Sequence, residues 1–423
     1  MQTLLKNIYI FLICIALSPL TAFAIVPTYT SSEHLTAGNN IKVYFNKNDS
    51  GKNEYIFSFP NALSLSYGDI VTFGDFYGDP DKAISLGESK EEREKRFLFA
   101  FNMFTVNTDS VEEANKIMDV IHNEQQYVLI AINNGEQPEA VYARISDETS
   151  RKLNCITGGG CDEKTWWLTS GRYLKLAEYN YDHFGENTLI AYQAGHDVAI
   201  RQAIAAGKNH DKKALEIAYA MNAFAQHFLS DRFASGHIRT PRKELNDHVT
   251  PEKVGATLAG YMHNEENEHG LHVHNNRGIG WISYGDNSYL SDRNDINRYM
   301  LNEALQTSTN HIFNAYLTGS ASVDSTMNII PYADETSPNT SQDISQLFYF
   351  DSSKNVLMRR ADMNNVDDKN WISNWWGWTT LIELRNQRGM PIALQRQLAL
   401  SHYKDRAIQD GLITDKDILN VVK

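Results

Sequence analysis

The chain has 423 residues and a formal net charge of −13, and it contains no basic tract. Long-range attraction to nucleic acid or to an anionic membrane is therefore not the expected mode of binding. The length is sufficient for a large hydrophobic core and favours two domains over one.

The first 24 residues have the pattern of a secretory signal peptide. Lys6 precedes an apolar run over residues 8–20, and Ala22, Phe23 and Ala24 supply an A-x-A cleavage site. Cleavage after Ala24 would remove 24 of the 423 residues and leave 399. No later segment is long and apolar enough to span a bilayer. We therefore expect a secreted or periplasmic protein without a transmembrane segment.

The mature chain is expected to be mainly α-helical, with a smaller α+β segment at its C-terminal end. Residues 25–64 are polar and turn-rich, with possible short strands at 43–45 and 56–59. Periodic apolar residues then predict helices over the following ranges: 90–103, 111–122, 166–179, 187–206, 211–231, 251–262 and 295–316.

A second unit is expected after a polar linker over residues 319–345, which is rich in Ser, Thr, Asp and Asn. Beyond it, LFYF and VLMRR predict a β-hairpin around DSSKN, and a helix is predicted over 391–412. We divide the mature chain into a catalytic domain over 25–330 and a C-terminal domain or extension over 331–423. Tryptophans in WISNWWGWTT suit buried packing better than a membrane-surface belt.

Two cysteines, Cys155 and Cys161, remain after Cys14 leaves with the signal peptide. In an oxidising compartment they are expected to form a disulfide. A zinc site built on two thiolates is less favoured, because no second cysteine pair exists. Metal ligands would then have to be histidines and carboxylates.

His227, Asp231 and His237 stand in the run HFLSDRFASGH at the end of a predicted helix that Asp211 caps. Residues four apart lie on nearly the same helix face, so His227 and Asp231 can converge on one cation. A lone histidine is more often an ordinary core residue, but three side chains of ligand type within eleven residues indicate a zinc site.

Further side chains of ligand type stand in turn-like or helix-end contexts. They are Asp75 in FGDFYGD, His183 in NYDHFGEN, and His263, Glu265, Glu266 and His269 in HNEENEHG. The histidines of EHGLHVH compete with His263 on spacing alone, but no carboxylate accompanies His272 and His274 on their expected strand face. His196 is interpreted as structural.

The runs HFGENTLIAYQAGHDVAI and HFLSDRFASGH resemble the superfamily of bacterial zinc-dependent phospholipases C and zinc-dependent single-strand nucleases. The phrases SYGDIVTFGDFYGDP, GHIRTPR and GIGWISYGD look like its secreted phospholipase C branch in Gram-negative bacteria. The resemblance covers roughly residues 60 to 320 and implies a helical catalytic domain with two or three Zn²⁺ ions.

The resemblance also implies the ligand sets. His183, His227 and Asp231 would hold one zinc, with Asp75 as a further ligand or general base. His237 and His263 would hold another, but Asn267 stands where the family has a carboxylate. We therefore expect Glu266, or else Glu265, to substitute. A third zinc would use His34, Asp231 and backbone groups at Ile25.

Several side chains near the expected centre have two interpretations each. Arg239 is expected to contact the substrate phosphate, as is Arg242, although both suit a surface turn equally. Tyr67, Phe76 and Tyr77 surround Asp75 and suit either a choline-sized pocket or core packing.

The sequence thus predicts an exported zinc phospholipase C that cleaves glycerophospholipids, such as phosphatidylcholine or phosphatidylglycerol, into diacylglycerol and a phosphorylated headgroup. Its partner would be phospholipid at a membrane or micelle surface. The alternatives are a zinc-dependent single-strand nuclease and a non-catalytic protein whose zinc only holds the fold. A nuclease would need a basic groove, which the charge disfavours.

Overall fold

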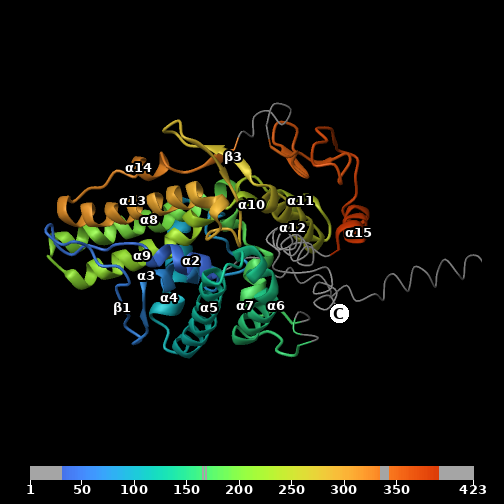
Figure 1. Ribbon diagram of the computed structural model, residues 1–423. Helices are drawn as coiled ribbons and strands as arrows, with labels where there is room; N and C mark the ends of the chain where they lie inside the picture. The colour runs from blue at the N-terminus through green and yellow to red at the C-terminus, as the bar shows by residue number, and fades with distance from the viewer. Residues whose placement is uncertain (1–30, 164–165, 167–168, 334–342, 390–423) are drawn as a thin grey trace, which may run out of the picture.

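The computed structural model describes residues 31–163, 166, 169–333 and 343–389 (Figure 1). The predicted signal peptide, Ile25 and the predicted helix over 391–412 lie outside these ranges. Within the described part of the chain, no helix combines the length and the apolar character needed to cross a membrane.

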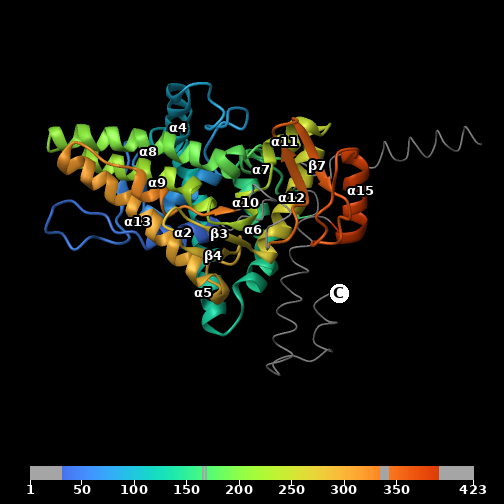
Figure 2. The ribbon, with the colours of Figure 1, turned by 90° about the horizontal axis from the view of Figure 1, so that it is seen from above.

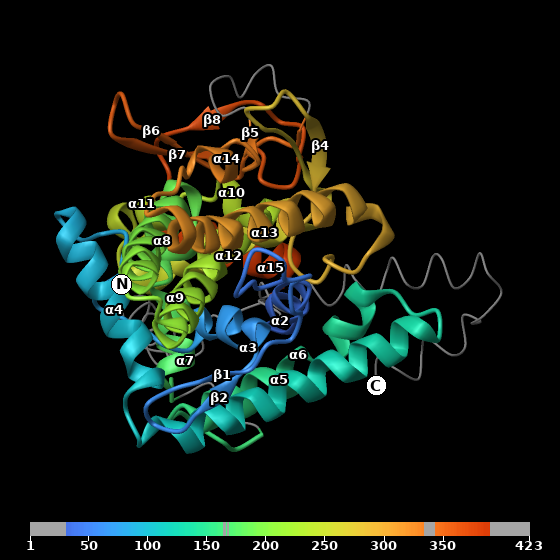
Figure 3. The ribbon, with the colours of Figure 1, turned by 90° about the vertical axis from the view of Figure 1, so that its left-hand side faces the viewer.

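Three long helices, which we call the central helices, run side by side through the helical body (Figures 1 and 3). They are α8 (Gly185–Lys208), α9 (Lys212–Asp231) and α13 (Asp295–Thr318). The Asp211 carboxylate accepts a hydrogen bond from the Ala214 amide and caps α9, as the sequence predicts. From Ala218 onward nearly every residue of α9 is buried, so this helix carries its C-terminal side chains into the interior.

Small residues allow α8 and α9 to approach closely. A Cβ atom added to Gly195 of α8 would lie 2.2 Å from the Phe97 ring and 2.7 Å from the Ala225 Cβ atom of α9. Ala191 and Ala199 of α8 and Ala218 of α9 are likewise fully buried. Close packing at this density leaves no room for larger side chains between the two helices.

Within the described ranges, further helices and two small sheets pack around these three helices, and a third small sheet lies in the C-terminal unit described below (Figure 2). The remaining helices of the body are α2 (Ser31–Asn39), α3 (Tyr67–Thr72), α4 (Lys90–Thr105), α5 (Ser110–Asn133), α6 (Pro138–Ile156), α7 (Arg172–Glu178), α10 (Ser235–Ile238), α11 (Arg242–His248), α12 (Glu252–His269) and α14 (Asp324–Met327). Short 3-10 turns are η1 (Phe73–Asp75), η3 (Tyr181–His183) and η4 (Asp292–Asn294). The body's strands are β1 (Phe57–Ser58), β2 (Ser64–Leu65), β3 (Leu271–His274), β4 (Gly280–Ser283) and β5 (Tyr332–Ala333).

Most predicted helices are present, but their ends differ from the prediction. Helix α5 extends to Asn133 and α12 to His269, whereas the helix predicted over 166–179 is only α7. Helix α6 was not predicted at all; Pro138 at its first turn is a start signal that the sequence does contain. Cys155, near its end, forms the predicted disulfide with Cys161.

The predicted linker over 319–345 is partly wrong, because its middle belongs to the helical body. Ile329 and Ile330 are fully buried. Strand β5 pairs antiparallel with β3, with Val273 opposite Ala333, and β3 in turn pairs with β4. The polar composition of residues 319–345 as a whole predicted a linker, although a few apolar residues within this range are buried.

The described C-terminal residues, 343–389, form a small α+β unit. Strands β6 (Phe348–Asp351), β7 (Val356–Arg360) and β8 (Trp371–Ile372) pair in the order β6-β7-β8, followed by α15 (Gly377–Arg388). The predicted hairpin is confirmed, with Phe348 opposite Arg359. The fold is therefore mainly α with a small α+β segment at this end, as expected.

This unit shares an apolar core with α11 and α12 (Figure 2). Leu347, Phe348 and Leu381 pack with Leu258 and Met262 of α12 in one cluster. Trp375 packs partly buried against the same cluster, whereas Trp376 is 63% exposed. The boundary at residue 330 stays a prediction, but the unit and α12 are packed as one body.

His196 belongs to a buried polar network between the central helices. Its Nδ1 atom lies 2.6 Å from the Asn222 Oδ1 atom, and its Nε2 atom lies 3.2 Å from the His311 Nδ1 atom. Burial lowers the pKa of His196 to about 4. The folded state therefore favours the neutral ring.

This network predicts a loss of stability in acid. A folded pKa below the ordinary 6.5 means that His196 contributes fully above pH 6.5 and that the contribution disappears as the pH falls toward 4. We expect about 3 kcal/mol of this loss from His196 alone. Denaturant unfolding of His196→Gln across this range should show a shallower pH slope than the parent. The control His274→Gln, which replaces an exposed histidine, should keep the parent slope; equal slopes in all three proteins would refute the assignment.

Candidate metal centre

Eight buried histidines and aspartates of the described chain converge from several elements at one end of the central helices. We call His34, Asp75, His183, His227 and Asp231 the first group, and His237, His263 and Asp286 the second group. Their nitrogen and oxygen atoms form sets in which every ligand atom lies within 4.8 Å of the others. All eight residues are at most 9% exposed.

The first group is centred on the last turn of α9. The Asp231 Oδ2 atom lies 2.8 Å from the His183 Nδ1 atom and 3.6 Å from the His227 Nε2 atom. Asp75, at the end of η1, places its Oδ1 atom 3.5 Å from His227 Nε2. The structure thus brings together the residues that the i,i+4 spacing and the resemblance selected.

His34 of α2 joins the first group on the other side of Asp231. Its Nε2 atom lies 3.4 Å from Asp231 Oδ1, and its Nδ1 atom lies 2.8 Å from the Ser230 hydroxyl. The two oxygens of Asp231 therefore face different histidines. A carboxylate in this position can bridge two cations.

The second group lies at α10, α12 and the loop after β4. The Asp286 Oδ2 atom lies 2.9 Å from His263 Nε2 and 3.6 Å from His237 Nε2, and the two Nε2 atoms are 3.0 Å apart. Asn267 Nδ2 also donates to Asp286 Oδ2, at 3.1 Å. Three side chains of types that suit zinc thus meet at one point.

Main-chain carbonyls orient two of these histidines. His227 Nδ1 lies 3.0 Å from the Val71 oxygen, and His237 Nδ1 lies 2.6 Å from the His183 oxygen. A carbonyl only accepts, so Nδ1 carries the proton and, in the neutral ring, Nε2 presents its lone pair to the aspartates. Burial lowers the pKa of both rings and favours that neutral form. Lone pairs and carboxylate oxygens that converge in this way fit a divalent cation.

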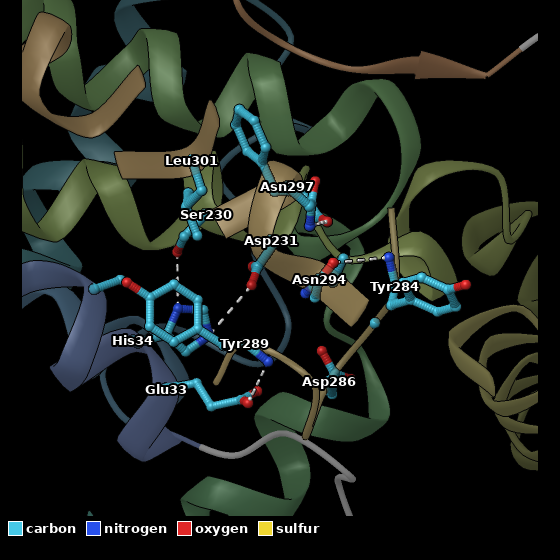
Figure 4. Close-up of a pocket in the computed structure, with 14 residues that line it drawn as sticks. Glu33, His34, Ser230, Asp231, Tyr284, Asp286, Tyr289, Asn294, Asn297 and Leu301 are labelled. Carbon is cyan, nitrogen blue, oxygen red and sulfur yellow. Dashed lines mark hydrogen bonds and ion pairs between the residues drawn. The ribbon is translucent and has the colours of Figure 1, made fainter. Parts of the chain in front are cut away.

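Both groups border one cavity. His34 and Asp231 of the first group and Asp286 of the second line it together (Figure 4). It holds about 440 Å³ of empty space, the solvent at its mouth included. Glu33, also on its wall, accepts from the backbone amides of Asn287 and Tyr289, at 2.8 Å each, and so fixes the loop that carries Asp286. Each group therefore presents at least one of its side chains to this cavity.

Glycine precedes the aspartate in both FGD and YGD because the neighbouring ligand shell leaves no space for a Cβ atom. A Cβ on Gly74 would lie 2.2 Å from the His227 ring. A Cβ on Gly285 would lie 1.6 Å from Asn267 Oδ1. Each contact is far below van der Waals distance, so each aspartate reaches its histidine only because a glycine precedes it.

The structure brings Asp286, and not the predicted Glu266, together with His237 and His263. The Glu266 Oε1 atom accepts from Arg239 Nε at 2.7 Å, and Glu266 is not among the residues that meet at the second group. Asn267 occupies the helix position where the resembled family has a carboxylate. Its side-chain amide donates a hydrogen bond to the Asp286 carboxylate, which comes from the loop after β4. The sequence offers only a weak signal for Asp286: a glycine precedes it, as Gly74 precedes Asp75.

Arg239 and Arg242 have partners other than a phosphate. Arg239 also donates to the Ile344 oxygen at 2.8 Å and is 8% exposed. Arg242 donates to the carbonyls of Ala177 and Ala256, at 2.7 and 2.8 Å. The expectation that Arg239 contacts substrate directly is therefore corrected, because its guanidinium is held by Glu266.

The aromatic side chains around Asp75 belong to the core. Tyr67, Phe76 and Tyr77 are at most 2% exposed, so they do not form the wall of an open choline pocket. Of the two interpretations that their positions allow, the structure supports packing.

The remaining candidates lie outside the centre. His272 is exposed and lies 2.7 Å from Asp343. Glu265, the second choice for the closing ligand, is bound by arginines of the C-terminal unit. The backbone groups at Ile25 lie outside the described residues.

Comparison with known proteins adds no neighbour: no family model, curated protein or solved structure matches this chain. The chemistry of the site therefore has to follow from its own residues.

Replacement of Gly285 tests the second group without removing a ligand. We expect Gly285→Ala to displace Asn267 or the Asp286 loop and to weaken metal binding at the second group at least about tenfold, as is usual for disturbed neighbours of ligands. Gly280→Ala is the matched control, because its added Cβ would meet only the Val273 oxygen, at 3.6 Å. Zinc affinity measured by chelator competition checks this; equal affinities for Gly285→Ala and the parent would contradict the geometry.

Proposed function

We propose that this protein is an exported zinc-dependent phospholipase C that hydrolyses the bond between glycerol and phosphate in glycerophospholipids. The observation that carries the proposal is the convergence of two buried groups of imidazoles and carboxylates on one open cavity. Adjacent metals at such sites are typical of enzymes that cleave phosphate esters. The motifs that resemble the secreted phospholipase C branch support the substrate class.

Zinc is the metal that this set of side chains favours. Histidine nitrogens with a few carboxylate oxygens suit zinc, whereas calcium and magnesium prefer oxygen ligands alone. Both mature cysteines are joined in the disulfide, so a thiolate structural site does not compete. His183, His227 and Asp231 of the first group, with Asp75, would hold one ion and the second group another; His34, with Asp231 as a bridge, would contribute to a third.

Bound zinc would acidify water and offset negative charge on the phosphoryl oxygens. The chain's own contribution is to aim and restrain the groups around that water. The Ser31 hydroxyl donates to Asp75 Oδ2 at 2.7 Å and leaves Oδ1 facing His227. Burial raises the pKa of Asp75, which suits a carboxylate that accepts a proton during the reaction. We assign Asp75 as ligand or general base on this basis.

The net charge of −13 supports a lipid over a polyanionic substrate. A nuclease would require a cationic groove that follows the backbone. Among the described residues, those that line the cavity between the two groups include Glu33, Asp231 and Asp286 but no Lys or Arg. The expected partner is therefore phospholipid in a micelle or membrane surface.

Loss of a ligand should abolish turnover. We expect His263→Ala and Asp231→Asn to lower the hydrolysis of phosphatidylcholine or phosphatidylglycerol micelles at least about 100-fold, because each removes a group that holds the charge-stabilising ions. Chelation should do the same to the parent, and added zinc should restore it. Release of diacylglycerol is the measurement.

The control is His272→Ala, which removes an exposed histidine outside both groups and should leave the rate unchanged. Circular dichroism establishes that each variant is folded. Full turnover in folded His263→Ala and Asp231→Asn would refute the proposal, and cleavage of single-stranded DNA without lipid hydrolysis would favour the nuclease.

A further inference from the structure

Helix α12 carries two buried acids beside His263, and each is bound by arginine. Glu265 and Glu266 are 5% and 1% exposed. A buried carboxylate is costly unless it is paired and hydrogen-bonded. The partners of these two acids therefore determine how α12 is fixed in place.

Glu265 is held by the C-terminal unit through a bidentate ion pair. Arg360 Nη1 and Nη2 lie 2.8 and 2.9 Å from the two Glu265 oxygens, and Arg388 Nη1 lies 2.7 Å from Oε2. Arg360 is fully buried and also donates to the carbonyls of Ser345 and Met363, at 2.6 Å each. One guanidinium thus joins β7 and two loops of the unit to α12.

Glu266 connects the same helix to the other histidine of the second group. It is bound by Arg239, which stands two residues after His237 and donates to Ile344 at the start of the described C-terminal residues. His237 and His263 therefore each lie within three residues of a member of this ion-pair network. The ligands of the first group lie on other elements.

Because its side chains point in defined directions, the ion-pair network can fix the rotation of α12 about its axis. Two residues along a helix differ by about 200° in direction, so Glu265 points to the C-terminal unit while His263 points to the metal centre. The apolar core shared by α12 and the unit attaches the two without fixing direction, since burial of apolar surface is non-directional. A two-pronged guanidinium–carboxylate pair does fix direction.

We propose that the C-terminal unit positions the second group: the clamp formed by Glu265, Arg360 and Arg388 sets the rotation of α12 at which His263 meets His237 and Asp286. This proposal depends on the metal centre of the proposed function, but it does not depend on which substrate the centre cleaves. The three clamp residues are positioning residues, because they act through His263. Residues 343–389 accordingly contribute to the geometry of the metal centre, although they supply no ligand to it.

The test is zinc binding by the full-length mature protein with Arg360→Met, Arg360→Lys and Glu265→Gln. A chelator titration reports the affinity of each ion, and cobalt substitution reports ligand geometry by visible absorption. His263→Ala identifies which ion belongs to the second group. We expect Arg360→Met and Glu265→Gln to weaken that ion at least about tenfold, as displaced ligand supports do, and to leave the other unchanged. Arg360→Lys should recover part of the affinity.

Arg359→Met is the matched control, because Arg359 lies in the same strand but faces Glu383 at 3.6 Å. It should bind both ions as the parent does. Since Arg360→Met leaves a buried carboxylate with less compensation and can unfold, the double variant Glu265→Met with Arg360→Met removes both charges and keeps the volume. It should fold and still show the selective weakening and a changed cobalt spectrum.

Parental affinity for both ions in the folded clamp variants would overturn the proposal, as would an equal loss of both ions, which indicates a general structural role. The proposed function fails separately: a parent that binds zinc in both groups but does not hydrolyse phospholipid would refute the phospholipase assignment and leave the clamp standing. A parent that binds no zinc would overturn both.

Discussion

The central constraint in this molecule is the burial of carboxylates against imidazole rings at the end of α9. Asp231 is 1% exposed and lies beside His183, His227 and His34, while Asp286 lies beside His237 and His263. Carbonyl oxygens fix the direction of His227 and His237. A buried carboxylate is costly unless it is paired and hydrogen-bonded. A divalent cation would make this gathering favourable, and the helical framework holds in place the segments that carry these side chains.

The surrounding helices and loops hold these histidine and aspartate side chains in place. Helix α9 is buried along its last turns and delivers two ligands of the first group, and close packing on α8 fixes its path. Glu33 and Asn267 hold the Asp286 loop from two sides, through the Asn287 and Tyr289 amides and through the carboxylate itself. We therefore expect a disturbance of these supports to lower the affinity for metal even when every proposed ligand is kept.

Local patterns in the sequence predicted most of the long helices and most of the side chains that meet at the candidate metal centre. His227 and Asp231 follow from i,i+4 spacing, and the Asp211 cap and the β6–β7 hairpin follow from local signals as well. Asp286 did not follow, because its role depends on a loop that returns to α12 and places it against Asn267, 19 residues away in the chain. Glu266 had the better spacing, but Arg239 binds it. Tertiary contacts decide which buried carboxylate lies beside the histidines, and the spacing of residues along the sequence carries no information on those contacts.

The most direct measurement is the zinc content and metal-edge X-ray absorption of the purified mature protein. We predict at least two zinc ions per chain, with nitrogen and oxygen ligands at about 2.0–2.2 Å and no sulfur ligand. We also predict that His263→Ala removes one ion and leaves another. A protein that holds no zinc after purification with zinc present, or a single ion that survives loss of His227, Asp231 and His263 together, would contradict a metal centre built from these side chains.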